Sequence, residues 1–213
     1  MIDLIGNTPL IKLKYPSEIT GCNIYGKAEF MNPGGSVKDR AALGIILDAE
    51  KNKFIEPGGT VVEGTFGNTG IALAMINNAR GYKTIIVMPD GASLEKRAIL
   101  KNLGAELRIV DTKPYTDPGN YQHVSKRLVE DLKNKGEGPV IWANQFDNIS
   151  NYQFHSQTTA KEIYEQLDGR VDAFTCAIGT GGTLAGTSIG LKELDQNIKI
   201  ACTDPQGARM YKY

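Results

Sequence analysis

Short apolar runs alternate with helical patterns along most of the chain. The runs predict strands near residues 24–30, 60–63, 83–88, 106–110, 139–143, 171–178 and 198–203. Apolar residues at helical spacing predict helices that begin near 36 and 70, helices over 93–103, 121–135 and 151–167, and one that ends near 194. Alternating strands and helices predict an α/β fold with mostly parallel sheets covered by helices on both faces.

Glycine-rich turns stand at three of the junctions between a predicted strand and the next helix. They are Asn32 to Ser36, Gly64 to Gly70 and Gly179 to Thr183. In parallel α/β folds, ligands bind at the carboxyl ends of the strands, which is where these turns fall. We therefore expect the three turns to form one site.

The first turn leads into Lys38. Ser36 is a suitable N-cap, and Val37, Ala41 and Ile45 recur every four residues on one helical face. Lys38 then lies in the first helical turn, where the positive end of the helix dipole disfavours a cation. Its pKa should be lowered, which would make the amine a usable nucleophile. The alternative is an ordinary exposed lysine.

The second turn, Gly64 to Gly70, offers backbone N–H groups at a helix N-terminus, which suit a carboxylate, and Asn68 adds an amide. The alternative is a tight turn whose glycines serve only the backbone. The third turn, Gly179 to Thr183, combines glycines with threonine hydroxyls and suits a phosphate. It matches neither a P-loop nor a dinucleotide fingerprint, although Asp204 keeps a nucleotide interpretation open.

Composition excludes several classes of protein. The 213 residues include 24 Lys and Arg and 24 Asp and Glu spread along the chain, which argues against a nucleic-acid or anionic-membrane partner. Cys22, Cys176 and Cys202 form no Cys-x-x-Cys pair, so neither a disulfide framework nor a metal site is expected. The N-terminus does not resemble a signal peptide and no apolar run is long enough to span a membrane, which predicts a cytoplasmic protein.

The two histidines, His123 and His155, are far apart on predicted helices. No acid partner or nucleophile pattern surrounds either of them, so we interpret both as surface or packing residues and not as catalytic bases.

Taken together, the turns call for one ligand that reacts with an amine, carries a phosphate and acts on a carboxylate. Pyridoxal phosphate, held by Lys38 as a Schiff base, fits this description with an amino acid as substrate.

Five motifs resemble, in order and spacing, those of the cysteine synthase group of fold-type II pyridoxal-phosphate enzymes, which includes O-acetylserine sulfhydrylases and cystathionine β-synthase. They are Ile5 to Leu10, Asn32 to Arg40, Gly67 to Gly70, Gln145 to Asn148 and Gly179 to Thr183, and the resemblance spans essentially the whole chain. It implies that Lys38 carries the cofactor and is the catalytic residue. It also implies that the cofactor contacts Asn68, Gly179, Thr180, Gly181, Gly182 and Thr183, and that the substrate carboxylate contacts Thr65, Phe66, Gly67, Asn68, Thr69 and Gln145.

The resemblance also implies an architecture like that of the tryptophan synthase β subunit, with two three-layer α/β domains that close over the substrate. The smaller, mobile domain would span 41–144, and the larger cofactor domain 1–40 and 145–213. Family members continue well beyond Tyr213, so the larger domain is expected to be incomplete at its C-terminal side. The family forms homodimers and can bind the C-terminal tail of serine acetyltransferase.

The implied reaction is β-replacement that forms cysteine from O-acetylserine and sulfide. Alternatives are another β-replacement or elimination on a serine derivative, such as cystathionine synthesis or serine dehydration, or a form that binds the cofactor without turnover. Phe66 motivates the last alternative, because the family usually has serine or a small residue there and a phenyl ring could narrow the site. The expected missing C-terminal segment motivates it as well.

Overall fold

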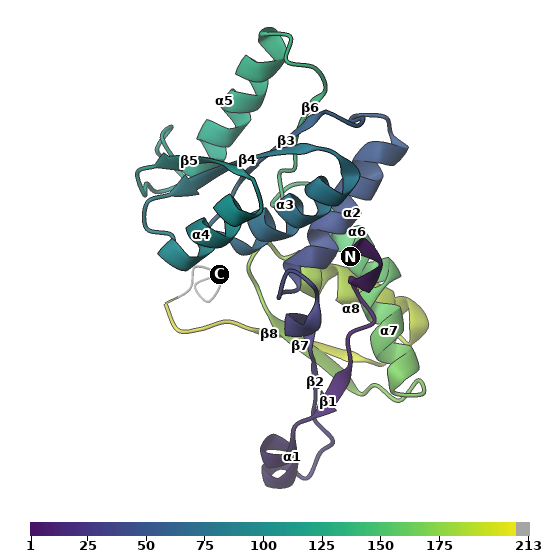
Figure 1. Cartoon of the computed structure of the whole chain (residues 1–213). Coiled ribbons are helices and arrows are strands. Elements are labelled where there is room, and N and C mark those ends of the chain that lie inside the picture. Colours follow the sequence, from purple (N-terminus) through teal and green to yellow (C-terminus); the bar gives the residue numbers. More distant parts are fainter. Residues whose placement is uncertain (208–213) are drawn as a thin grey trace.

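A four-stranded parallel sheet forms the larger of the two layered regions in the computed structural model, which describes residues 1–207 (Figure 1). Its strand order is β5-β4-β3-β6, with every neighbouring pair parallel. The strands are β3 (Thr60–Gly64), β4 (Lys83–Pro89), β5 (Glu106–Val110) and β6 (Val140–Trp142). The sequence pattern predicted all four to within one residue at either end, because long apolar runs between turn residues are a strong signal.

Helices cover both faces of this sheet. The first face packs against α2 (Lys38–Lys51), α3 (Asn68–Arg80) and α4 (Leu94–Asn102) through buried residues such as Val61, Ile76, Ile86 and Leu100. On the opposite face, Val129 and Leu132 of α5 (Tyr121–Asn134) pack against Val62, Ile85 and Val140. The predicted α/β class with mostly parallel sheets is confirmed.

The second region is built on two parallel strands, β7 (Ala173–Ala177) and β8 (Lys199–Thr203). Ala160 and Ile163 of α7 (Thr159–Gln166) and Leu191 of α8 (Gly182–Leu194) cover one of its faces, together with Ile198. The other face carries exposed residues such as Thr175 and Ala177.

The helices α8 and α6 (Ser150–Gln157) pack closely against each other along α8. A side chain at Gly186 would collide with the carbonyl of Tyr152, and one at Gly190 would lie 2.5 Å from the carbonyl oxygen of Ser156. Since real Cβ atoms essentially never approach so closely, only glycine permits this packing at both positions.

The single helix predicted over 151–167 is wrong: α6 and α7 are separate helices that meet at Thr158. The backbone there leaves helical geometry (φ −122°, ψ −67°), and the Thr158 hydroxyl donates to the Phe154 carbonyl at 2.6 Å. A threonine side chain that bonds to the backbone four residues earlier is typical of a bent helix.

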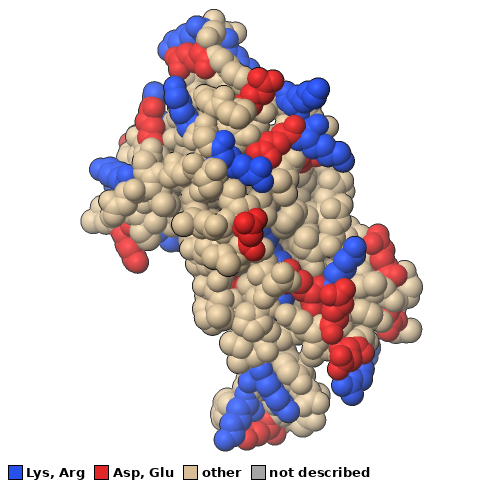
Figure 2. Space-filling model, turned by 45° about the vertical axis from the view of Figure 1, so that its right-hand side comes forward, with Lys and Arg blue, Asp and Glu red and all other residues tan. Residues whose placement is uncertain are grey.

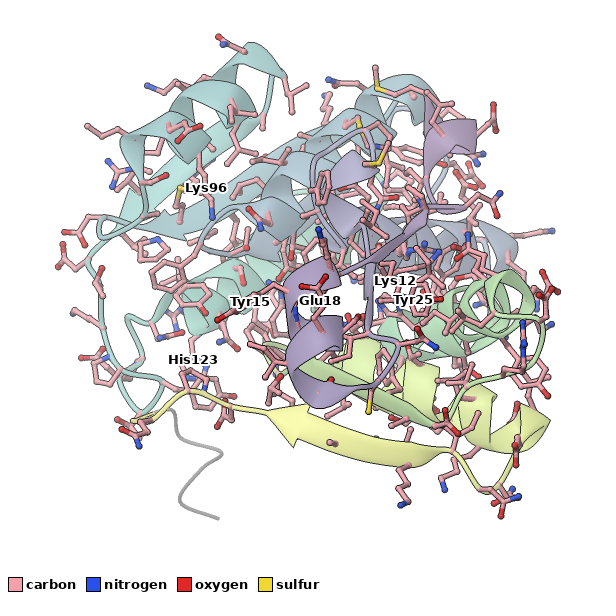
Figure 3. The ribbon with its side chains drawn as sticks, turned by 90° about the horizontal axis from the view of Figure 1, so that it is seen from below. Lys12, Tyr15, Glu18, Tyr25, Lys96 and His123 are labelled. Carbon is pink, nitrogen blue, oxygen red and sulfur yellow. The ribbon has the colours of Figure 1, made fainter. Side chains whose placement is uncertain are left out.

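Part of the N-terminal segment forms an arm that projects away from the rest of the chain, at the bottom of Figure 1. The arm consists of the antiparallel strands β1 (Leu10–Lys12) and β2 (Tyr25–Lys27) with α1 (Lys14–Thr20) between them. The short helices η1 (Ile2–Leu4) and η2 (Glu29–Met31) flank the arm, and Ile2 packs against the core formed by α2 and α3. The predicted strand over 24–30 is thus shorter, and the sequence pattern did not predict α1. Figure 3 shows Tyr15 and Glu18 of α1 together with Lys12 and Tyr25 of the hairpin.

A buried guanidinium ties the arm to both regions. Arg40, at the start of α2, is fully buried and forms ion pairs with Glu29 at 2.8 Å and with Glu162 of α7 at 2.7 Å. Lys27 of the arm also pairs with Glu162 at 2.7 Å. Burial alone would raise the pKa of Glu162, but the hydrogen bonds from Arg40 and Lys27 outweigh it and lower the pKa to about 2.

On the face shown in Figure 2, positive and negative side chains are interspersed over large neutral areas. Within residues 1–207, none of the helices has both the length and the apolar character required to cross a lipid bilayer.

Candidate active site

The amine of Lys38 lies at the start of α2, as the sequence predicted. The Ser36 hydroxyl accepts the Lys38 N–H at 3.2 Å, so it does cap the helix, although the residue next to the helix is Val37. Burial lowers the pKa of Lys38, and Cys176 on β7 opposes the shift. The direction is the predicted one, but burial rather than the helix dipole is its main cause.

The second turn opens α3. Gly67 stands before the first helical residue, Asn68, with φ +147°, and its N–H donates to the Thr65 hydroxyl at 3.2 Å. The aliphatic stem of Lys96, labelled on α4 in Figure 3, lies against Gly67 where a side chain would otherwise project. Asn68 is exposed, whereas Thr65 and Thr69 are buried.

Phe66 directs its ring at a neighbouring helix. The ring meets Tyr121 of α5 edge to face, with centroids 5.3 Å apart, and is 46% exposed. An edge-to-face pair holds both rings in place. The phenyl group therefore forms an aromatic pair at the side of the turn.

Gln145 joins the second turn to the loop after β6. Its side-chain oxygen accepts the Thr69 hydroxyl at 2.5 Å, and its side-chain nitrogen donates to the Gly64 carbonyl at 3.3 Å. Asn151 of α6 donates to the Gln145 carbonyl at 2.9 Å and to the Thr180 hydroxyl at 3.0 Å. This one amide thus connects the second turn with the third.

The third turn opens α8. Gly181 precedes the helix with φ +89°, and the helix begins at Gly182. A Cβ at Gly179 or Gly181 would meet nothing within 4 Å, so the turn has open space in front of it, whereas Gly182 packs against Asn151. The free N–H groups of a helix N-terminus facing open space form an anion site.

His155 contacts the third turn through Thr183. It is fully buried, with Nδ1 2.8 Å from the Thr159 hydroxyl and Nε2 3.2 Å from the Thr183 hydroxyl. Burial, and then the positive charges of Arg40 and Lys38, lower the pKa of His155 to about 4, so the imidazole is neutral at pH 7. His123 instead lies beside Tyr115, with Nε2 2.7 Å from its carbonyl oxygen.

These residues fit pyridoxal phosphate. The turn at 179–183 leaves room for a phosphate at a helix N-terminus, and the half-buried Lys38 lies near β7, the strand that leads into that turn. Asn151 links the same turn to the residues expected to hold a carboxylate. The structure therefore brings Lys38 close to β7 and connects the turn expected to hold a phosphate with the turn expected to hold a carboxylate.

Comparison with known proteins decides the family. A family model described as "Pyridoxal-phosphate dependent enzyme" matches residues 1–212. The chain belongs to this family. Pyridoxal phosphate is the family's cofactor, as the sequence predicted.

Cysteine synthases are among its similar curated relatives. Cysteine synthase 1 of Neurospora crassa is 53% identical over 98% of this chain, and cysteine synthase of Dictyostelium discoideum is 48% identical over 99%. This chain covers 54% of each relative, so it spans about half the length of the curated relatives it matches. The crystal structure of O-ureido-L-serine synthase has a TM-score of 0.88 and 38% identity, covering 99% of this chain and 64% of that one.

Sequence reasoning missed Asn151 and the contact of His155 with Thr183. Both side chains come from α6, four residues apart, and reach the third turn from the same helical face. That spacing of polar residues on a predicted helix was the available signal. The roles of the individual site residues and the domain boundaries stay predictions.

Proposed function

We propose that the protein forms L-cysteine from O-acetyl-L-serine and sulfide by pyridoxal-phosphate-dependent β-replacement. The observation that carries the proposal is the position of Lys38, half-buried near an open phosphate turn that Asn151 connects to the carboxylate turn. The high identity to cysteine synthases supports this reaction over others in the family.

Each turn has its own task in this proposal. The N–H groups at the start of α8 and the hydroxyls of Thr180 and Thr183 hold the cofactor phosphate, with His155 orienting Thr183. The N–H groups at the start of α3 and the amide of Gln145 hold the substrate carboxylate. Two fixed anion sites orient the substrate Cα toward Lys38.

Pyridoxal phosphate, when bound, supplies an electron sink for the charge that develops at the substrate Cα. Lys38 Nζ anchors the cofactor and, once released by the substrate, removes the proton from Cα as a general base. This step needs a neutral amine, and the lowered pKa of Lys38 raises the neutral fraction at a given pH. Asn68, at the first position of α3, is proposed to contact the cofactor's ring hydroxyl.

Other reactions on serine derivatives are the competing candidates. The likeness to O-ureido-L-serine synthase, a protein named for a different serine product, is the observation that favours them. Cystathionine synthesis and serine dehydration use the same two anion sites. Product analysis with sulfide, homocysteine or no added nucleophile separates them.

The first test is the visible absorption of the purified chain with pyridoxal phosphate, before and after O-acetyl-L-serine is added. A visible band that changes on addition, followed by cysteine formation with sulfide, supports the proposal. A band that does not change shows cofactor binding without turnover. A chain that stays colourless contradicts cofactor binding by these residues.

The variant Lys38→Ala should lose this band and cysteine formation completely, because no other amine replaces the anchor and the base. Lys199→Ala, on the exposed side of β8, is the matched control and should keep both. Circular dichroism checks that both variants are folded. Cysteine formation by Lys38→Ala at the unmodified rate would contradict the assignment of this lysine.

The proposal includes a homodimer formed through the N-terminal arm. The arm exposes Ile11, Tyr15, Ile19 and Tyr25, with Tyr15 73% and Ile19 65% exposed, and projecting apolar side chains of this kind are typical of an interface. Light scattering should show a dimer for the unmodified chain and a monomer for Tyr15→Glu combined with Ile19→Glu. A monomer for the unmodified chain would contradict the dimer.

Three further predictions remain part of the proposal. The mobile domain expected over 41–144, which contains the four-stranded sheet, would close over bound substrate, the site could accept the C-terminal tail of serine acetyltransferase, and the protein would reside in the cytoplasm. Small-angle scattering with and without substrate, binding of a tail peptide, and cell fractionation test them in turn.

A further inference from the structure

Glu63 is a buried acid that the proposed reaction leaves without a role. It lies near the end of β3 and is 1% exposed, and its Oε2 is buried without a hydrogen-bond partner among the residues that the structure describes. It pairs in register with Ile86 of β4, so both point to the sheet face covered by α2, α3 and α4. A carboxyl in such a place requires an explanation.

The neighbours of this carboxyl lie at the start of the second turn and in the loop after β6. Burial raises the pKa of Glu63 to about 8. The backbone N–H and side chain of Gln145, and the backbone N–H groups of Asn144 and Gly64, act in the opposite direction and lower the pKa. At pH 7 the group is therefore mainly a neutral acid. Asn144 has φ +47°, an unusual value that turns the chain just before Gln145.

Gln145 is the residue through which Glu63 reaches the site. Its side chain is fixed on one side by Thr69 at 2.5 Å and on another by the Gly64 carbonyl at 3.3 Å. Its own N–H and amide lie against Glu63. Gly64 also directly follows Glu63 in β3, so a shift of the acid would move two of the contacts that hold Gln145.

We infer that Glu63 is a positioning residue whose buried carboxyl holds Gln145 in place and so shapes the proposed carboxylate site of Gln145 and Thr69. That this site takes the carboxylate of an amino acid rests on the proposed function. The inferred link between Glu63 and Gln145 is independent of the proposed function.

Neutrality matters because a charge on Glu63 would face the carboxylate of the ligand. Like charges held in a poorly solvated site repel strongly. Tyr121 of α5 is the other titratable side chain that interacts with Glu63. Burial is the main cause that raises the pKa of Tyr121, and the charge of Glu63 raises it further. On the sheet face to which Glu63 points, α2 and α3 contribute apolar residues toward β3, among them Ile45, Ala72 and Ile76. Carboxylate binding should therefore weaken as pH rises through about 8.

The first experiment needs no cofactor. The side-chain amide signal of Gln145 is followed by nuclear magnetic resonance from pH 6 to pH 10, roughly two pH steps either side of the expected midpoint, in the unmodified chain and in Glu63→Gln. We expect the signal to shift with a midpoint near 8 in the unmodified chain and to stay constant in Glu63→Gln. Tyr121→Phe, which removes the other titrating group, should leave the midpoint in place. The same titration in Glu63→Gln would overturn the inference, as would a signal that never shifts in the unmodified chain.

The second experiment uses the chain loaded with pyridoxal phosphate and L-alanine, an amino acid without a leaving group, as the probe. The affinity for L-alanine should fall between pH 7 and pH 9 in the unmodified chain, and this fall should be roughly tenfold larger than in Glu63→Gln. A roughly tenfold change is the size expected from the loss of one hydrogen bond to a charged group. The α-amine of the probe titrates equally in both proteins. The variant Glu63→Leu, if it folds, should bind L-alanine roughly tenfold more weakly at pH 7 while keeping cofactor affinity.

The two experiments separate the inference from the proposed function. A Gln145 signal that follows Glu63, combined with no effect on L-alanine, supports the positioning link and contradicts the carboxylate site. A chain that does not bind the cofactor contradicts the proposed function, and the resonance experiment still decides the role of Glu63.

Discussion

The strands of the four-stranded and two-stranded sheets were predicted from the same kind of apolar run, but their surroundings are very different. Every residue of β3 is buried, as is every residue of β4 after Lys83, because helices cover both faces. In β7, half-buried residues alternate with exposed ones, and in β8 every residue except Ile200 is exposed, because α7 and α8 cover a single face. The turn proposed to hold the phosphate nevertheless follows β7. The proposed site therefore rests on one firmly enclosed sheet and one that is half open.

The comparison teaches that an apolar run predicts a strand but not how deeply the strand is buried. Residues 171–178 and 83–88 both read as continuous strands. Only the number of covered faces distinguishes them, and that number depends on which helices pack there. Four predictions test how far the two sheets differ and how strongly they are coupled.

The largest effect should come from breaking the link between the two regions. Arg40→Leu leaves Glu29 and Glu162 without their partner and should cost about 3–5 kcal/mol of unfolding free energy. Urea unfolding measures the loss. Arg170→Leu, which removes an exposed pair with Asp168, is the matched control and should change the free energy by less than about 0.5 kcal/mol. Equal losses in the two variants would show that the buried link is unimportant.

Truncation of one isoleucine in each sheet compares them directly. Ile86→Ala in β4 removes a fully buried side chain and should cost about 3 kcal/mol, whereas Ile200→Ala in β8, which is only half-buried, should cost about 1 kcal/mol. Urea unfolding gives both values, and amide hydrogen exchange should be faster in β8 than in β4. A larger loss in β8 would mean that the two-stranded sheet is better enclosed than its exposure indicates.

Acid should weaken the same link without any substitution. The pKa of Glu162 is about 2 in the folded chain, below its ordinary value of 4.5. Its stabilising effect is therefore complete above pH 4.5 and is lost as pH falls toward 2. Stability measured across this range should fall less steeply in Glu162→Gln than in the unmodified chain. Glu165→Gln, exposed on the same helix, should leave the slope unchanged.

The smallest effect concerns the turn that follows β7. Gly181→Ala places a Cβ in the open space of the proposed phosphate site and forces an alanine to φ +89°. We expect cofactor affinity to fall roughly tenfold and stability by about 1 kcal/mol. Gly104→Ala, with φ +74° and similar open space far from the site, should show the stability loss alone. Unchanged cofactor affinity in Gly181→Ala would contradict the phosphate assignment.

Local signals explain what the sequence predicted well. The strands of the larger sheet follow from apolar runs bounded by glycine and proline. The three turns lie before α2, α3 and α8 as predicted, but they follow strands of three different sheets, so the rule for a single parallel sheet does not by itself bring them together. The helix predicted over 93–103 is α4, and Ser93 caps it by accepting the Lys96 N–H at 3.3 Å.

Contacts between distant residues explain what the sequence could not predict. The bridge from Asn151 to Thr180 joins residues 29 positions apart, and the burial of Glu63 depends on helices that pack over β3, so the apolar pattern alone predicts neither. The short helix α1 begins just before Pro16 and lacks a buried apolar stripe, so its periodicity is weak.

The buried guanidinium of Arg40 has a consequence for synthesis on the ribosome. Glu162, its partner, lies 122 residues later in the chain. At about 5–20 residues per second, roughly 6–24 seconds pass before that carboxylate is made. Until then α2 carries a cation with only half of its partners, so the nascent chain cannot bury this end of the helix. The final closure of the fold must wait for α7 to leave the exit tunnel.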